Sequence, residues 1–135
     1  ISRTETRRKV EELLERCGLE KEYADRYPYQ VSGGQCQRAA IARALAVNPS
    51  ILICDEATSA LDVTVQKQIL ELLIELKKKE NFSFILICHD LALVQAFCDR
   101  VLVLYHGKTV ESGTPDETID HPQMDYTRKL IDSVL

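Results

Sequence analysis

Two acidic residues at the end of an apolar run are the first feature of this sequence that suggests chemistry. The run Ile51–Cys54 is followed at once by Asp55 and Glu56. A short, wholly apolar run predicts a strand buried on both faces of a sheet, and ligands bind at the carboxyl ends of such strands. One carboxylate there can hold Mg²⁺ through water, and its neighbour can polarise an attacking water. The alternative is an ordinary strand end with two solvated acids.

A second group of residues lies upstream, at Ser32-Gly33-Gly34-Gln35. Ser32 and Gln35 are spaced as a capping box at the start of a helix. Capping does not explain the two adjacent glycines, because each costs a helix about 1 kcal/mol. Glycine lets the backbone approach a ligand closely, and a helix N-terminus attracts anions. The group therefore predicts a phosphate site at the start of a helix.

A histidine follows a second apolar run. His89 comes directly after Phe82–Cys88, so we expect it at the same sheet edge as Asp55 and Glu56. The alternative is a turn histidine bonded to Asp90. One Asp, one Glu and one His at one edge could also suggest a metal site, although only one His is present there and no Cys has ligand spacing.

The elements that position these residues follow from the periodicity of apolar residues. Ser2 and Glu5 form a capping box that predicts a first helix, which ends near Gly18. Further helices are predicted after Ser32, over 65–76 and 91–97, near 116 and over 126–134, with strands at 51–54, 82–88, 101–105 and 109–111. A hairpin turn is predicted at 106–108. Strand, helix and strand over 51–88 form a βαβ unit, so the predicted class is α/β with a parallel core.

Composition excludes several kinds of protein. The 135 residues are 45% hydrophobic, with 17 basic and 21 acidic side chains and a net charge of -4. This balance gives no reason to propose a nucleic-acid or lipid-surface binder, and no apolar run approaches the roughly 18 residues of a membrane span. The cysteine count is odd, with 5 residues and no C-x-x-C pair, which predicts neither a disulfide framework nor a zinc site.

Taken together, these residues resemble four motifs of the ABC ATPases. Val31-Ser32-Gly33-Gly34-Gln35 resembles the signature motif, and Ile51–Glu56 resembles the Walker B strand with its catalytic glutamate. Ser59–Asp62 resembles the D-loop, and His89 resembles the switch histidine. The four motifs occur in the order and at the spacing of that family, over essentially the whole chain.

The C-terminal part resembles the dipeptide, oligopeptide and nickel importers within that family. The resemblance rests on Val110–Gly113, His121-Pro122 and Tyr126–Leu130, and Tyr27-Pro28 before the signature fits the same group. Val31 stands where Leu is usual, and Met124-Asp125 stands where His-Pro is frequent.

The resemblance implies a partial P-loop NTPase (ABC ATPase) fold with a parallel-sheet core and part of the helical signature subdomain. No G-x-x-x-x-G-K-[ST] loop occurs and the sequence starts at Ile1, so we expect the second half of a domain whose phosphate-loop half is missing. Three segments are expected: a helical signature segment over 1–50, a catalytic α/β core over 51–113 and a helical tail over 114–135. Strand 101–105 is expected either to slide in beside strand 82–88 or to leave that edge for another copy.

The resemblance also implies a mechanism, in which two ATPase domains close head-to-tail around two ATP molecules. Asp55 would hold Mg²⁺ through water, Glu56 would act as the general base or orient the water, and His89 would contact the γ-phosphate. The remaining site residues would act across the dimer: Ser32, Gly33, Gly34 and Gln35 would reach the ATP held by the other domain, and Asp62 would couple the two sites.

The implied partners are a second ABC ATPase domain and transmembrane permease subunits, and no nucleic acid is expected to bind. The implied location of the ATPase is the cytoplasmic face of the cell membrane. The chain alone is expected to be inactive without the phosphate loop. Two alternatives remain open. One is a soluble ABC-type ATPase of DNA repair, chromosome organisation or translation. The other is a non-catalytic interaction module.

Overall fold

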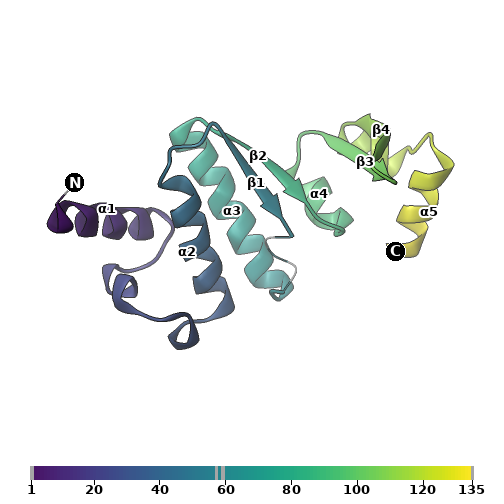
Figure 1. Ribbon diagram of the computed structural model, residues 1–135. Coiled ribbons are helices and arrows are strands. Elements are labelled where there is room, and N and C mark those ends of the chain that lie inside the picture. The colour runs from purple at the N-terminus through teal and green to yellow at the C-terminus, as the bar shows by residue number, and fades with distance from the viewer. Residues whose placement is uncertain (1, 57, 59, 135) are drawn as a thin grey trace. The chain divides into compact units, whose positions relative to one another are not determined.

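The chain folds into two compact units, Ile1–Ile87 and Cys88–Leu135. The computed structural model describes residues 2–56, 58 and 60–134 (Figure 1). The elements of the first unit are α1 (Arg3–Arg16), η1 (Lys21–Asp25), η2 (Pro28–Gln30), α2 (Gly33–Leu45), β1 (Ile51–Asp55), α3 (Val63–Glu80) and β2 (Ser83–Ile87). Those of the second are α4 (Leu91–Phe97), β3 (Val101–Tyr105), β4 (Lys108–Gly113), η3 (Asp116–Asp120) and α5 (Asp125–Val134). The three segments expected from the sequence remain a prediction.

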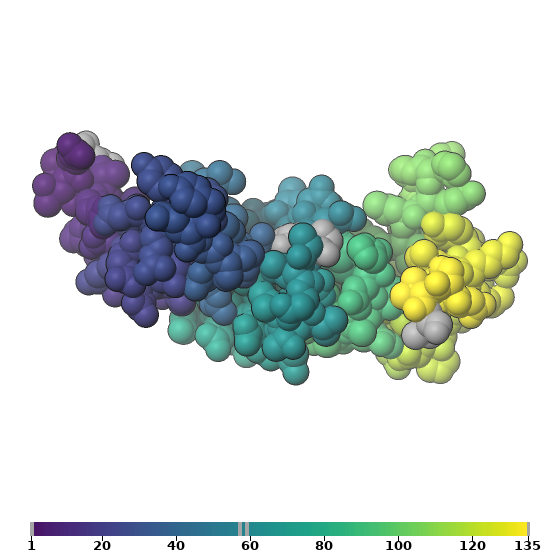
Figure 2. All heavy atoms as spheres, turned by 90° about the horizontal axis from the view of Figure 1, so that it is seen from below, coloured from purple at the N-terminus to yellow at the C-terminus, as the bar shows by residue number. Residues whose placement is uncertain are grey.

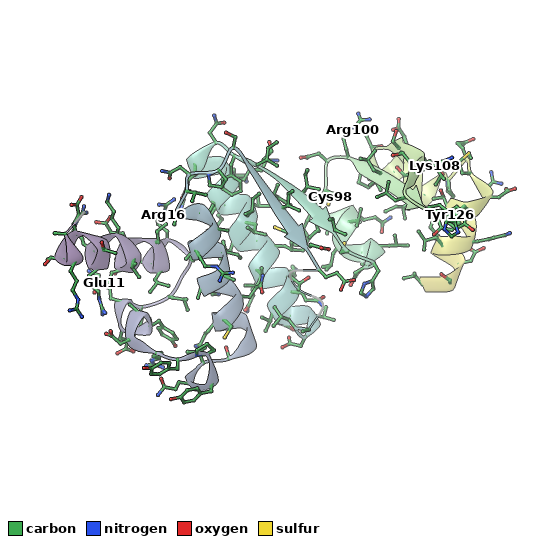
Figure 3. The ribbon with its side chains drawn as sticks, viewed as in Figure 1. Glu11, Arg16, Cys98, Arg100, Lys108 and Tyr126 are labelled. Carbon is green, nitrogen blue, oxygen red and sulfur yellow. The ribbon has the colours of Figure 1, made fainter. Side chains whose placement is uncertain are left out.

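Helix α1 starts and stops where its sequence predicts. The Ser2 hydroxyl oxygen accepts a hydrogen bond from the Glu5 amide at 3.2 Å. At the other end Gly18 has φ +74°, a left-handed conformation that suits glycine. Arg16, labelled in Figure 3, then ties the end of α1 to α3, since its Nε donates to Glu80 at 2.8 Å.

The predicted βαβ unit is confirmed. Strands β1 and β2 pair in parallel, from Ile51 opposite Ser83 to Asp55 opposite Ile87, and α3 connects them. Helix α3 is anchored by its apolar stripe, in which the fully buried members are Ile69, Leu70 and Leu73. Burying each such side chain contributes about 1.5–3 kcal/mol, so this stripe fixes the helix against the sheet.

The prediction that strand 51–54 is buried on both faces is wrong. Leu52 and Cys54 are buried, whereas Ile51 and Ile53 are 58% and 64% exposed. Ile85 on the neighbouring strand is also exposed. The physical reason is that, in the part of the chain described, helices α2 and α3 cover one face of the two-stranded sheet and leave the other open (Figure 1).

The second unit is built on a hairpin. Strands β3 and β4 pair antiparallel through a two-residue turn, His106-Gly107, with φ of 46° and 75°. Positive φ at both positions matches the twist of the strands. The predicted turn is therefore confirmed, except that Lys108 already belongs to β4. Within the described residues β3 pairs only with β4, so the expected move of strand 101–105 beside strand 82–88 is not found, and self-association remains a prediction.

Helix α5 is fastened to this hairpin by one carboxylate and one aromatic contact. Glu111 of β4 accepts hydrogen bonds from the amides of Gln123 and Met124, at 2.7 and 3.2 Å. The rings of Tyr105 and Tyr126 lie 4.2 Å apart, and Figure 3 shows Tyr126 on α5. The tail therefore packs as an ordered part of the second unit.

Candidate functional site

The tip of β1 carries the two acidic residues. Asp55 is the last residue of the strand, and the Glu56 amide extends the pairing by donating to the Ile87 carbonyl at 2.9 Å. Glu56 has φ +44°, a left-handed conformation that costs a non-glycine residue about 1–2 kcal/mol. Both side chains are exposed, while burial of Cys54 just behind them raises the pKa of its thiol. Strain of this kind often accompanies a functional site.

The start of α2 forms the predicted capping box. The Ser32 hydroxyl oxygen accepts from the Gln35 amide at 3.2 Å, and the Gln35 Oε1 accepts from the Ser32 amide at 2.9 Å. Two of the backbone donors at the helix start are thereby satisfied reciprocally. The Ser32 hydroxyl proton and the remaining amides of the first turn are the donors with which this helix start can meet an anion.

The two glycines have a packing role that the sequence did not predict. A Cβ on Gly34 would lie 2.7 Å from the Cγ1 of Val65, and one on Gly33 would lie 3.1 Å from the Cδ2 of Leu61. Contacts under 3.0 Å are essentially never tolerated by a real Cβ. Gly34 therefore allows α2 to pack closely against the start of α3, whether or not a ligand is present.

One hollow joins the two regions. It has a volume of about 560 Å³, and its lining includes Gly33 from the start of α2 together with Asp55 and Glu56 from the tip of β1. Ala60 and Leu61 close it from the loop before α3. The structure thus brings one member of the predicted phosphate site together with the predicted carboxylates, while Ser32, Gly34, Gln35 and Asp62 are outside this lining.

Asp62 lies at the start of α3, where its side chain has a structural partner. Its carboxylate accepts a hydrogen bond from the Val65 amide at 3.0 Å and so caps the helix. One turn further on, the side-chain amide nitrogen of Gln66 (Nε2) donates a hydrogen bond to the Thr58 backbone carbonyl at 2.7 Å. Gln66 was not predicted; its place in the turn after Asp62 is the only signal that could have found it. Ser59, the first residue of the predicted D-loop, lies outside the described residues.

His89 belongs to the second unit, between β2 and α4, and its side chain is exposed. The next residue, Asp90, caps α4 by accepting from the Leu93 amide at 3.1 Å, as its position predicts. His89 therefore belongs to a different unit from Asp55 and Glu56. Its predicted place beside them remains a prediction.

Residues 2–56, 58 and 60–134 contain neither a metal-binding cluster nor a membrane-spanning helix. Nowhere in that part of the chain do three or more His, Cys, Asp or Glu side chains gather as a metal site would require. No helix in the same residues has the length and apolar character of a membrane span.

Comparisons with known proteins define the class. The family model described as ABC transporter matches residues 1–59. The glutathione import ATP-binding protein GsiA of Pectobacterium atrosepticum is 49% identical over 132 residues, which are 98% of this chain and 21% of the relative. The oligopeptide transport ATP-binding protein OppF of Escherichia coli is 48% identical over 134 residues, which are 99% of this chain and 40% of the relative.

A solved structure agrees with the sequence relatives. The dimeric post-hydrolysis state of the ATP-binding cassette MJ0796, bound to ADP and Pi, matches 85% of this chain and 49% of its own, with a TM-score of 0.71 and 36% identity. The fold is that of an α/β P-loop NTPase domain, of which this chain covers a part. The chain belongs to the ABC transporter ATP-binding family. It spans between 21% and 40% of the length of the two relatives named above.

Proposed function

We propose that this chain is part of the ATP-hydrolysing subunit of an ABC importer for di- or oligopeptides or nickel, and that the subunit couples ATP binding and hydrolysis to solute transport. The relatives named for glutathione import and oligopeptide transport support a peptide solute. The resemblance of the C-terminal part to peptide and nickel importers points the same way.

The observation that carries the proposal is the backbone of Glu56. Glu56 has a left-handed backbone conformation, and its backbone N–H donates a hydrogen bond to the Ile87 carbonyl at the end of β1. In the proposed mechanism Glu56 is the general base that takes a proton from the attacking water, and Asp55 next to it holds the metal ion. A strained, exposed acid directly after a strand of a parallel pair suits that role better than it suits a solvated strand end.

The residues at this tip fit Mg²⁺. The ion is usually bound by one or two carboxylates together with water and phosphate oxygens, not by a cage of protein ligands. Two adjacent exposed carboxylates, Asp55 and Glu56, without a larger acidic cluster among the described residues, match that pattern. Asp55 would hold the ion through water; when bound, the ion would neutralise charge on the phosphates.

The other residues would act across a dimer of two ATPase domains. Ser32, Gly33, Gly34 and Gln35 would contact the ATP of the second domain, Asp62 would couple the two sites, and His89 would contact the γ-phosphate. The dimer of MJ0796 with ADP and Pi supports such an assembly. Transmembrane permease subunits complete the proposed system, and the ATPase domains would lie at the cytoplasmic face of the membrane.

Glu56→Gln in the full-length protein that carries this chain tests the proposal. The amide keeps the shape of the side chain but cannot act as a base, and loss of a general base typically costs 10²–10⁴-fold in rate. We expect phosphate release to fall by at least about 100-fold while ATP binding is retained. Glu71→Gln is the matched control, since Glu71 is an exposed acid on α3. Normal turnover by Glu56→Gln would show that Glu56 is not the base.

A further inference from the structure

The Tyr23 hydroxyl reaches the last residue of the predicted phosphate site. Tyr23 lies in η1, and its hydroxyl oxygen accepts a hydrogen bond from the Gln35 side-chain amide nitrogen at 2.7 Å. Both side chains are half-buried. Figure 2 shows the dark blue atoms of this segment in a continuous surface with the start of α2, and Tyr23 and Gln35 line one shared hollow there.

The chemistry of the capping box fixes the orientation of the Gln35 amide. The Ser32 backbone amide can only donate, so the atom that faces it at 2.9 Å must be the Gln35 oxygen. The nitrogen therefore faces Tyr23. Gln35 is held at both ends of its amide group, by Ser32 on one side and by the Tyr23 phenol on the other.

Tyr23 is itself held in place. The Arg26 guanidinium lies 4.4 Å from the centroid of the Tyr23 ring, a cation–π contact, and Arg26 pairs with Glu22 at 3.0 Å. The segment that carries these residues is fastened to α1 by the paired hydrogen bonds of Arg7 with Asp25, at 2.5 and 2.6 Å. The phenol oxygen is therefore a fixed point against which Gln35 can be oriented.

We propose that Tyr23 is a positioning residue for the nucleotide contact made by the start of α2. By fixing the Gln35 amide it keeps the Ser32 backbone donor occupied, and this holds the turn from Ser32 to Gln35 in one conformation before ATP arrives. Tyr23 touches no nucleotide in this scheme and acts only through Gln35. The proposal rests on the proposed function, in which this turn meets the ATP of the second domain.

The test is Tyr23→Phe in the full-length protein, which removes one oxygen and keeps the ring under Arg26. A single net hydrogen bond corresponds to roughly a two- to tenfold change, so we expect kcat to fall within that range. The KM for ATP should stay unchanged, since the other domain supplies most contacts to that ATP, and the protein should remain folded at the assay temperature. Tyr29→Phe is the matched control: Tyr29 is 82% exposed and its variant should keep full activity.

Gln35→Ala and the double variant separate this proposal from the proposed function. If Tyr23 acts through Gln35, adding Tyr23→Phe to Gln35→Ala should cause no further loss. Multiplying losses, or a fall in the melting temperature that accounts for the lost activity, would mark a structural role and overturn the proposal. So would full activity of Tyr23→Phe beside an impaired Gln35→Ala. Full activity of Gln35→Ala would overturn the assigned role of this turn as well.

Discussion

The start of α2 and the tip of β1 both belong to the proposed site, yet they are held in different ways. At the start of α2 the backbone is held by contacts within the chain: Ser32 and Gln35 cap each other, and Gly34 packs against Val65. At the tip of β1, Glu56 adopts a strained backbone conformation, and the strand behind it has one open face, with Ile53 64% exposed.

The two regions differ in how far they depend on the rest of the fold. A capping box and a close helix contact use neighbours that are near in the sequence or packed in the same unit, so they form without help. A strand tip is only as rigid as its sheet. A sheet with one exposed apolar face is stabilised by less burial than a sheet covered on both faces. The α2 region should therefore tolerate isolation better than the β1 tip.

The largest expected effect concerns catalysis by the 135-residue chain on its own. A complete α2 start cannot replace a phosphate-binding loop, and the sequence contains no G-x-x-x-x-G-K-[ST] motif to supply its amides and lysine. We expect phosphate release at millimolar ATP and Mg²⁺ no faster than in buffer, with the full-length protein as the positive control. Turnover that Glu56→Gln abolishes would contradict this expectation and would show the β1 tip to be self-sufficient.

The next effect is on stability, at Gly34. In Gly34→Ala the new Cβ would lie 2.7 Å from the Val65 side chain, and overpacking typically costs about 1–3 kcal/mol. Part of that is offset by the better helix propensity of Ala, about 1 kcal/mol. We expect the free energy of unfolding in urea to fall by a net ~0–2 kcal/mol.

Two further variants test whether contact with Val65 causes the loss of stability in Gly34→Ala. Gly33→Ala should lose less, because its Cβ would meet only the flexible end of Leu61, at 3.1 Å. Val65→Ala added to Gly34→Ala should recover part of the loss by removing the clashing methyl groups. A Gly34→Ala protein more stable than the parent would mean that α2 does not pack against α3 as described.

Much of this site was accessible from the sequence because its signals are local. The capping box, the helix start at Ser2 and the acid pair after an apolar run each depend on residues within a few positions of one another. Pairing of β1 with β2 followed from the rule that a strand–helix–strand unit is parallel. These features are decided by backbone chemistry that a short window of sequence contains.

The remainder could not be predicted because it depends on contacts between distant residues. Nothing in the sequence around Tyr23 signals that its hydroxyl meets Gln35, 12 positions away. The apolar run of β1 indicates burial on both faces, but the open face of Ile51 and Ile53 depends on which elements cover the sheet. A pattern of residue types records the tendency to be buried and not the identity of the covering layer.

A smaller stability effect is expected at Glu56. Glycine adopts positive φ without the steric cost of about 1–2 kcal/mol that Glu pays there, although it loses more conformational entropy on folding, about 0.5–1 kcal/mol. Glu56→Gly should therefore raise the free energy of unfolding by a net ~0–1.5 kcal/mol in urea titrations. Asp55→Gly within β1 should lower it, since glycine weakens a strand interior. A destabilised Glu56→Gly would show that the backbone at the β1 tip is not strained.

The smallest expected effect is the pH dependence of the α1–η1 contact that supports Tyr23. Hydrogen bonds from Arg7 hold the pKa of Asp25 below its ordinary value. A carboxyl with a lowered pKa in the folded state stabilises the fold above its unfolded pKa, about 3.9. That contribution disappears as the pH falls through the lower, folded value. The Asp25 side chain is 69% exposed, so water and salt screen the pair and the effect is small.

Asp25→Asn isolates this contribution, because the amide keeps the size of the side chain and cannot titrate. Near pH 6 the parent chain should melt slightly above the variant, and the difference should close as the pH falls below the ordinary aspartate value of about 3.9. It should also close near 1 M salt, where the screening length is about 3 Å. Because η1 carries Tyr23, the same acidification should loosen the hold on Gln35. A difference in melting temperature that survives both acid and salt would assign the Arg7–Asp25 contact to packing and remove the electrostatic link between α1 and the start of α2.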